Sequence, residues 1–266
     1  MKLHLRRAMA VYWKDMLDLR KNRALLFSML ALPLVLVLVP VGVIWAYVHN
    51  GNDGDLRAMA MFYEPDFPLK ASAARYLVDK TLTDWFGLYL VMPVFVPILI
   101  SSHSIAGEKE RRTLEPLLAT PITAAELVLG KSLASVVPAC VISVFAYLLL
   151  CLSVDVVAWP MAHAPLLPNG LWTFGVLVIA PLFAFFGNGV AVIVSARVAE
   201  ARLAQQLSAL VVLPLMGLVG GQLAGFLRAG PQYYAMQAGV VAVLDVGLMI
   251  ASVRLLDRER LLSRWA

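Results

Sequence analysis

The sequence predicts an all-α integral membrane protein with six transmembrane helices, an N-terminal interfacial helix and a short cytoplasmic helix between the second and third spans. Hydrophobic residues make up 61% of the 266-residue chain and charged residues only 15%, and the mean hydropathy is +0.80. A water-soluble domain of this size could not bury so much apolar surface. The apolar residues also gather in blocks of about 20 residues, the length that a helix needs to cross a hydrocarbon layer of about 30 Å.

Six apolar blocks give the expected spans, at residues 25–48, 85–106, 133–153, 171–195, 203–227 and 233–253. Backbone groups in lipid must be hydrogen-bonded within their own segment, so we expect these blocks to be helices and not barrel strands. The whole chain, 1–266, is expected to form a single transmembrane domain. Within it, 49–84 is an external loop and 107–126 is a cytoplasmic loop.

The segment before the first span, residues 1–23, has a helical apolar stripe. Its members are Leu5, Met9, Tyr12, Trp13 and Met16. This spacing predicts an amphipathic helix that lies along the membrane surface. The alternative, a plain basic tail in solvent, would not need such a stripe. We expect no signal peptide, because the apolar block that follows is about twice as long as a typical signal-peptide core.

Basic residues are unevenly shared between the two sides of the expected bundle. Most of them lie in the N-terminal segment, the second and fourth connections and the C-terminal segment. The positive-inside rule therefore places both termini and the loop 107–126 in the cytoplasm. We expect the membrane to be the bacterial cytoplasmic (inner) membrane. The net charge of +5 then reflects this topology and attraction to anionic lipid, and it requires no nucleic acid.

Two outer connections have distinct compositions. The loop 49–84 mixes acidic and aromatic residues and has a helical pattern over 71–83, so we expect a small external cap or an interfacial helix. The connection 157–169 contains three prolines and is expected to be an irregular loop or a re-entrant segment. The two cysteines, Cys140 and Cys151, both fall in the third span and would be about 16 Å apart on one helix, too far to pair.

One charged stretch in the middle of the chain, GEKERRTLEPLLATPITAAELVLGKS, runs from residue 107 to 132 and ends like a phosphate-binding loop. A Walker loop needs glycine where Ala125 stands, so we expect no nucleotide site in this chain. Lys131 is instead expected to extend from the start of the third span to the membrane interface. The sequence also has no metalloprotease motif, nucleophile elbow or acid pair at helical spacing within a span, so no catalytic residue and no metal site is predicted.

The same stretch contains helix signals on both sides of a break. Thr123 and Glu126 have the spacing of a capping box at the start of the third helix. Opposite charges four residues apart support a charged turn before the break: Glu108 with Arg112, and Arg111 with Glu115. Prolines isolate a short segment between them, whose leucines have helical spacing: Leu114, Leu117 and Leu118. We expect this leucine knob to project into the cytoplasm, and the alternative is an ordinary structural loop.

The residues GEKERRTLEPLLATPITAAELVLGK resemble the loop between the second and third spans of type-2 ATP-binding-cassette (ABC) transporter permeases. The stretch ARLAQQLSALVVLPLMGLVGG, residues 201–221, is similar to the fifth-span region of the same family. The six spans, the N-terminal helix and the internal termini also fit, so the resemblance covers essentially the whole chain. The external loop is longer than a simple member of the family would need, which leaves room for an external partner at 49–84.

The resemblance implies a permease that works as a dimer, most simply a homodimer with a second copy, together with two separate cytoplasmic ATPase subunits. ATP and Mg would then be bound by the ATPase, and this chain would hold no cofactor. The short helix of the loop would be the coupling helix that docks in the ATPase and links hydrolysis to export. The implied coupling residues are Glu108, Arg111, Arg112, Leu114, Glu115, Leu117 and Leu118.

Two groups of residues within the expected spans have roles that the sequence leaves open. Gly217, Gly221 and Gly225 repeat every four residues, which would allow close helix contact within the bundle or across a dimer. Three polar residues lie inside the membrane: Asp245, Asn188 and Gln222. Asp245 is costly there, so we expect it to mark a substrate or ion route, or to be a protonated or paired acid that ties helices together.

Other functional classes remain as alternatives. An ion-coupled secondary transporter would normally show several ionisable groups or paired broken helices inside the membrane, and Asp245 alone gives it little support. A non-transporting membrane scaffold is the other alternative. The sequence leaves open the substrate, the direction of transport apart from the family resemblance, the choice between homodimer and heterodimer, and the role of the external loop.

Overall fold

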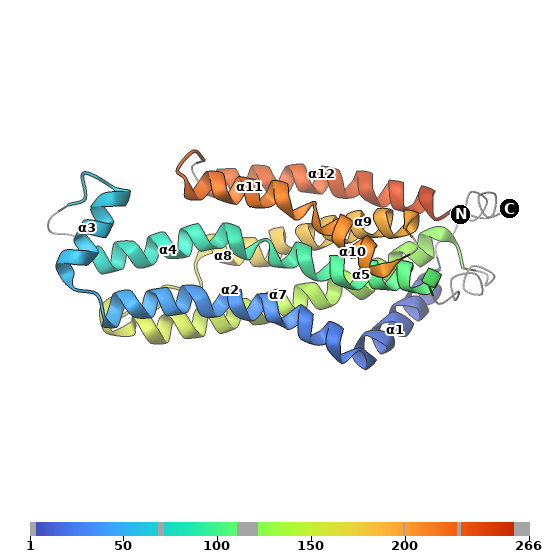
Figure 1. Cartoon of the computed structure of the whole chain (residues 1–266), viewed down its shortest axis with the longest axis horizontal. Helices are drawn as coiled ribbons and strands as arrows, with labels where there is room; N and C mark the ends of the chain where they lie inside the picture. The colour runs from blue at the N-terminus through green and yellow to red at the C-terminus, as the bar shows by residue number, and fades with distance from the viewer. Residues whose placement is uncertain (1–3, 69–71, 111–121, 199, 228–229, 258–266) are drawn as a thin grey trace.

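The computed structural model describes residues 4–68, 72–110, 122–198, 200–227 and 230–257. These residues form an elongated bundle of helices and contain no strand. α1 and the last turn of α12 lie at one end of the long axis, here called the α1 end, and α3 lies at the opposite end, the α3 end (Figure 1). Six helices or helix series in the described part are long and apolar enough to cross a membrane. The predicted fold class, an all-α bundle with six spans, is confirmed.

The helices follow the predicted order. They are α1 (Leu5–Lys21), α2 (Arg23–His49), α3 (Asp53–Tyr63), α4 (Ala73–Tyr89), α5 (Met92–Glu110), α7 (Ala124–Ala162), α8 (Gly170–Phe174), the π-helix η1 (Gly175–Ile179), α9 (Ala180–Arg197), α10 (Ala201–Ala209), α11 (Val212–Leu223) and α12 (Pro231–Leu255). The six spans are α2, α4 with α5, α7, α8 with η1 and α9, α10 with α11, and α12.

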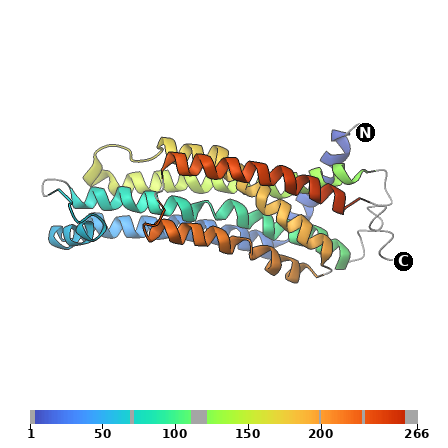
Figure 2. The same ribbon diagram turned by 90° about the horizontal axis from the view of Figure 1, so that it is seen from above.

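The helix predicted in 1–23 is α1, and it has two different faces. One face is buried against the bundle and consists of Ala8, Val11, Asp15 and Leu19. The other face exposes apolar side chains one turn apart: Leu5, Met9, Trp13 and Leu17. α1 is set at an angle to the long axis in both Figure 1 and Figure 2. It packs mainly on α7.

The second span is a broken helix that begins well before the predicted block. α4 starts at Ala73, where the Ser72 side chain accepts a hydrogen bond from the Arg75 amide. The helical pattern expected over 71–83 is therefore continuous with the span. The chain leaves the helix at Leu90 and Val91 and resumes as α5 at Met92. Pro93 explains the break, because its ring nitrogen cannot donate the hydrogen bond that would continue α4.

The loop between the first two spans forms a small helical cap at the α3 end. α3 packs against the first part of α4. Their contact is a separate apolar cluster that contains Leu56, Ala60, Phe67, Ala73 and Leu77. This cluster explains why the loop is longer than a simple turn, since it has a core of its own.

The third span is one uninterrupted helix of 39 residues. The predicted capping box is confirmed, because Thr123 and Glu126 each bond to the other's backbone amide. The expectation of an irregular segment over 157–169 is wrong for its first part, because α7 continues through Pro160 and ends at Ala162. Proline near the end of a helix removes only one of the last hydrogen bonds. Asp155 then fixes the following loop by accepting from the amides of Leu166 and Leu167, at 2.8 and 3.1 Å.

The fifth span is also broken, at Leu210 and Val211, and it ends earlier than predicted. Pro214 follows this break as Pro93 follows the break in the second span. Its ring nitrogen cannot donate to the Leu210 carbonyl, which accepts from the Leu213 amide at 3.1 Å instead. α11 ends at Leu223, and Gly225 follows in the left-handed conformation with φ of 78°. The amide of Phe226 donates to the Gly221 carbonyl at 2.9 Å, which completes a Schellman turn.

The centre of the bundle is the contact between α5 and α9. Gly187 of α9 lies directly against the Val94 carbonyl of α5, where a Cβ atom would clash with the backbone. The absence of a side chain therefore allows the two helices to approach closely. In Figure 1, α11 and α12 form a layer on one side of these central helices, and α2 and α7 form a layer on the other side.

Candidate functional site

Three consecutive charged residues at the end of α5, Glu108, Lys109 and Glu110, bond to four other helices. They lie at the start of the loop 107–126 and directly precede residue 111. Glu108 contacts α1 and α7, Lys109 contacts the end of α9, and Glu110 contacts the start of α10. We call this group the α5 clamp. It connects one end of the loop 107–126 to α1, α7, α9 and α10.

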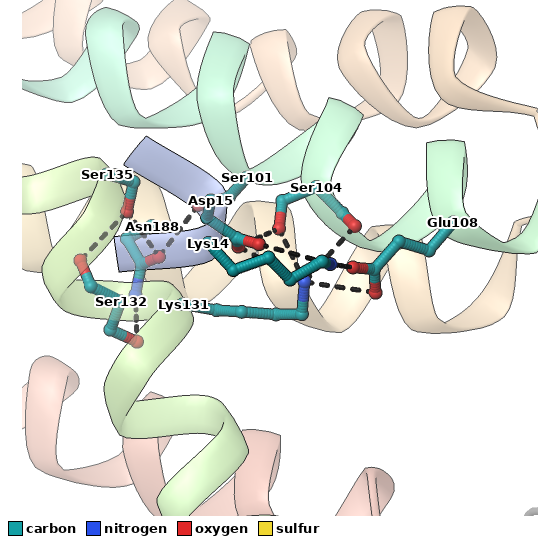
Figure 3. A network of polar contacts seen from close by, with 9 residues as sticks. All are labelled: Lys14, Asp15, Ser101, Ser104, Glu108, Lys131, Ser132, Ser135 and Asn188. Atoms are coloured by element: carbon teal, nitrogen blue, oxygen red, sulfur yellow. Dashed lines mark hydrogen bonds and ion pairs between the residues drawn. The ribbon is translucent and has the colours of Figure 1, made fainter. Parts of the chain in front are cut away.

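The Glu108 part of the clamp contains a buried lysine. Lys131 of α7 is 2% exposed, and its Nζ atom lies 3.0 Å from Glu108 Oε2 and 3.2 Å from Asp15 Oδ2. Nζ also donates to Ser104 Oγ at 2.7 Å, and that hydroxyl donates to Asp15 Oδ2 at 2.6 Å. Figure 3 shows these side chains converging from α1, α5 and α7. A buried ammonium is stable here because two carboxylates and a hydroxyl replace its water shell.

A second lysine, Lys14, balances the charge of this cluster. It contacts Glu108 and lies 3.5 Å from Asp15, while its side chain stays 43% exposed. Two lysines and two carboxylates therefore leave no net charge in the cluster. Partial burial works against the charged form of Lys14, but the hydrogen bond and the charge of Glu108, helped by Asp15, outweigh it and raise the pKa of Lys14.

The other two charges of the clamp cap helix ends. Lys109 Nζ donates to the carbonyl of Ser195 at 3.1 Å and to that of Ala196, in the last turn of α9. Glu110 Oε1 accepts from the amide of Ala201 at 2.8 Å, in the first turn of α10. A cation at a helix C-terminus and an anion at an N-terminus both match the helix dipole. The end of α5 thus fixes the turn from the fourth span to the fifth.

A polar knot lies deeper in the bundle, where α5, α7 and α9 meet. The amide of Asn188 is 3% exposed and bonds to three serines. Its Oδ1 accepts from Ser101 at 2.8 Å and lies 2.9 Å from Ser135 Oγ, and its Nδ2 donates to Ser132 Oγ at 2.8 Å. These bonds join the three helices through side chains that are all satisfied (Figure 3).

The Gly-Lys-Ser sequence that resembles a phosphate-binding loop has a packing explanation. A Cβ at Gly130 would lie 2.5 Å from the Ala8 carbonyl and 2.7 Å from Val11 Cβ, so glycine lets α1 lie directly on α7. Lys131 belongs to the ion cluster, and Ser132 belongs to the Asn188 knot. The expectation that Lys131 extends to the interface is wrong, because carboxylates from α1 and α5 hold it inside the bundle.

The predicted coupling residues are only partly within the described structure. Glu108 lies in the clamp, and its partners Lys14 and Lys131 are far from it in sequence. The others lie outside the described residues: Arg111, Arg112, Leu114, Glu115, Leu117 and Leu118. Sequence reasoning missed Asp15, Lys109 and Glu110 as site residues. The GEKE motif and the lone acid on the buried face of α1 were the available signals for them.

The three glycines of the fifth span do not form one face. Gly217 has open space where a Cβ would be, Gly221 faces Leu227, and Gly225 lies beyond the end of α11 in the Schellman turn.

Of the intramembrane polar residues, Asn188 and Gln222 are buried and hydrogen-bonded. Asp245 has two buried carboxylate oxygens that find no hydrogen-bond partner among the described residues. The described residues also contain no cluster of three or more His, Cys, Asp or Glu side chains that could hold a metal ion.

The fold and the clamp define a multi-pass α-helical membrane protein whose second and third spans are joined at a charged junction. The model of a known protein family, described as ABC-2 family transporter protein, matches residues 9–240. The chain belongs to this family, as the sequence resemblance predicted. It is therefore the transmembrane permease component of an ABC transporter, and members of the family in general imply an ABC ATPase partner. No curated protein matches the sequence.

Proposed function

We propose that this chain is the permease subunit of an ABC exporter in the bacterial cytoplasmic membrane, with both termini in the cytoplasm. A separate ATPase subunit would bind ATP and Mg and would dock on the loop 107–126. A second copy of the chain would complete the transport pathway. The family match supports the permease role, and the positive-inside distribution of basic residues supports the orientation.

The observation that carries this proposal is the α5 clamp at the foot of the loop. A displacement of the loop moves the end of α5, and Glu108, Lys109 and Glu110 tie this end to four other helices. A loop without such connections could move without effect on the bundle. The clamp therefore gives an ATPase docked at 107–126 a mechanical route to the transmembrane helices.

The docking step is proposed to depend on the leucine knob, Leu114, Leu117 and Leu118. Burying one leucine is worth roughly 1.5 to 3 kcal/mol, whereas an exposed ion pair is worth about 0 to 1 kcal/mol. Since about 1.4 kcal/mol corresponds to a tenfold change in affinity, loss of one buried leucine weakens ATPase binding by about tenfold or more. The charged residues around the knob, Arg111, Arg112 and Glu115, contribute mainly to orientation.

The test is co-purification of the permease with the ATPase encoded beside it. Leu117→Asp should abolish or strongly weaken co-purification while the permease still elutes as a folded particle. Phe62→Asp is the matched control, because Phe62 is 83% exposed on α3 at the opposite end of the bundle. Normal co-purification and normal permease-stimulated ATP hydrolysis in Leu117→Asp would exclude the loop as the docking element.

A further inference from the structure

α11, the second half of the fifth span, is held to the bundle by a small contact. Of its 12 residues, only Val219 and Gln222 are buried. At one end, the break at Leu210 and Val211 separates α11 from α10, and at the other end the Schellman turn follows. α10 differs, because Glu110 caps it and its residues Ala201, Ala204 and Ser208 are buried. The two halves of this span are therefore anchored to very different extents.

Among the described residues, Gln222 makes the side-chain hydrogen bonds that join α11 to its neighbours. Gln222 Nε2 donates to the Thr83 carbonyl of α4 at 3.3 Å, and Gln222 Oε1 accepts from the Tyr234 hydroxyl of α12 at 3.0 Å. Gly87 makes room for this amide, since a Cβ there would lie 2.8 Å from Oε1. Gln222 thus joins three helices, and its removal would leave α11 attached through the buried Val219 and the partly buried Val212 and Leu215.

A narrow cavity of about 10 Å³ lies between α4, α9, α11 and α12. This volume is close to the smallest that can hold one water molecule. Its apolar lining includes Leu90 and Val91, at the break of the second span, and Phe183 of α9. Gln222, Tyr234 and Gln237 supply the polar groups, and the buried Gln237 Oε1 finds no hydrogen-bond partner among the described residues. The mixture of apolar and polar lining residues is typical of a ligand-binding site. The cavity volume of about 10 Å³ is far too small for a ligand, so such a site would be closed in this structure.

We propose that α11 is a hinged gate, which turns at Leu210 and Val211, releases Gln222 and opens this cavity as a binding site for an apolar or amphipathic small molecule. The broken helices at 90–91 and 210–211 let the gate move while α5 and α10 stay clamped at the α1 end. Aliphatic and aromatic side chains would bind the apolar part of the ligand. The free amide of Gln222 and the Gln237 carbonyl would accept or donate its few hydrogen bonds. The role of the gate in transport rests on the proposed permease function. The two hydrogen bonds of Gln222 to Thr83 and Tyr234, here called the latch, can be tested in the isolated chain.

The latch is tested by the reactivity of a cysteine in the cavity. Leu90→Cys is introduced into a background with Cys140→Ala and Cys151→Ala, since Leu90 is only 3% exposed. Adding Gln222→Met keeps the side-chain volume but removes both hydrogen bonds, so the rate of N-ethylmaleimide labelling should rise about tenfold. Gln206→Met, on an exposed position of α10, is the matched control and should leave the rate unchanged.

Two further measurements separate gate opening from general loosening. Ala139→Cys, at a fully buried core position, should stay unreactive in the Gln222→Met background. The amphipathic dye rhodamine 6G should slow the labelling of Leu90→Cys in that background, and glucose should not. An unchanged labelling rate at Leu90→Cys in Gln222→Met overturns the latch. Equal labelling with and without the dye overturns the proposed ligand class.

The gate in the working transporter is tested by a reversible cross-link. A Cβ at Gly87 would lie 3.4 Å from Val219 Cγ2 and 2.8 Å from Gln222 Oε1, so Gly87→Cys is combined with Val219→Cys and Gln222→Ala. In this variant a disulfide between α4 and α11 should form and take the place of the Gln222 contact. In complex with the ATPase, the cross-link should stop the ATP-dependent increase in Leu90→Cys labelling, and reductant should restore it. An increase that persists in the cross-linked protein overturns the gate. Failure of the ATPase to bind would instead refute the proposed function. The labelling experiment on the isolated chain would then still show whether the Gln222 hydrogen bonds keep the cavity closed.

Discussion

Replacing Lys131 by methionine should test whether the buried ion cluster holds α1 on the bundle. The substitution keeps most of the apolar stem but removes the ammonium that lies between Asp15 and Glu108. Both carboxylates are largely buried, at 9% and 8% exposure. Among the described residues, Lys14 is then the lysine that remains beside both carboxylates, and it is half-exposed. The two carboxylates must therefore either stay charged with less compensation or bind protons.

The expected magnitude follows from the burial of the partners. Removing one member of a buried ion pair typically costs about 3 to 5 kcal/mol, and the remaining contact to Lys14 favours the lower end of this range. Lys14→Met should cost only about 0 to 1 kcal/mol, because the Lys14 side chain is 43% exposed. The triple variant Asp15→Asn, Glu108→Gln, Lys131→Met should regain most of the loss, since no buried charge remains unpaired and water can hydrate the half-exposed Lys14.

Thermal unfolding in detergent and limited trypsin digestion provide the measurements. Lys131→Met should lower the Tm by about 6 to 12 °C and should speed cleavage in α1 after Arg20 or Lys21. The triple variant should resemble the unmodified protein in both assays. A Lys131→Met variant as stable as Lys14→Met, with α1 equally resistant to trypsin, would refute the role assigned to the cluster.

Three further predictions concern helix packing and topology. Gly130→Ala should displace α1 and destabilise the fold by about 1 to 3 kcal/mol. The control Gly107→Ala has open space at its Cβ position and should be neutral or stabilising by up to about 1 kcal/mol. Similar Tm values for the two variants would argue against a close α1–α7 contact. Asn188→Leu leaves three serines without their shared partner and should cost about 1 to 2 kcal/mol in thermal unfolding, and an unchanged Tm would show that the knot is not structural. Cysteine at Asn52 should react with an impermeant maleimide on intact cells and cysteine at Ala119 should not, and the reverse pattern would invert the proposed orientation.

The sequence by itself determined the class of protein, the number of spans and their order. Hydropathy is additive over about 20 residues of one helix, so each span can be recognised without knowledge of its neighbours. The capping box of Thr123 and Glu126 was predictable for the same reason, because both residues lie in one helical turn. The loop motif was specific enough to indicate the family. Span limits were less accurate, since α4 and α7 continue as helices beyond the apolar blocks.

Only the tertiary structure decided which polar residues meet. Lys131 and Asp15 are 116 positions apart in the chain, and Gln222 and Thr83 are 139 apart. No local pattern encodes such pairs, because they depend on how helices pack side by side and on the close approach that Gly130 and Gly87 allow. The sequence therefore suggested an interfacial Lys131 and left the role of Gln222 open. Packing instead buries the lysine in an ion cluster and makes the glutamine the polar link of α11 to its neighbours, since buried polar groups need partners that only neighbouring helices can supply.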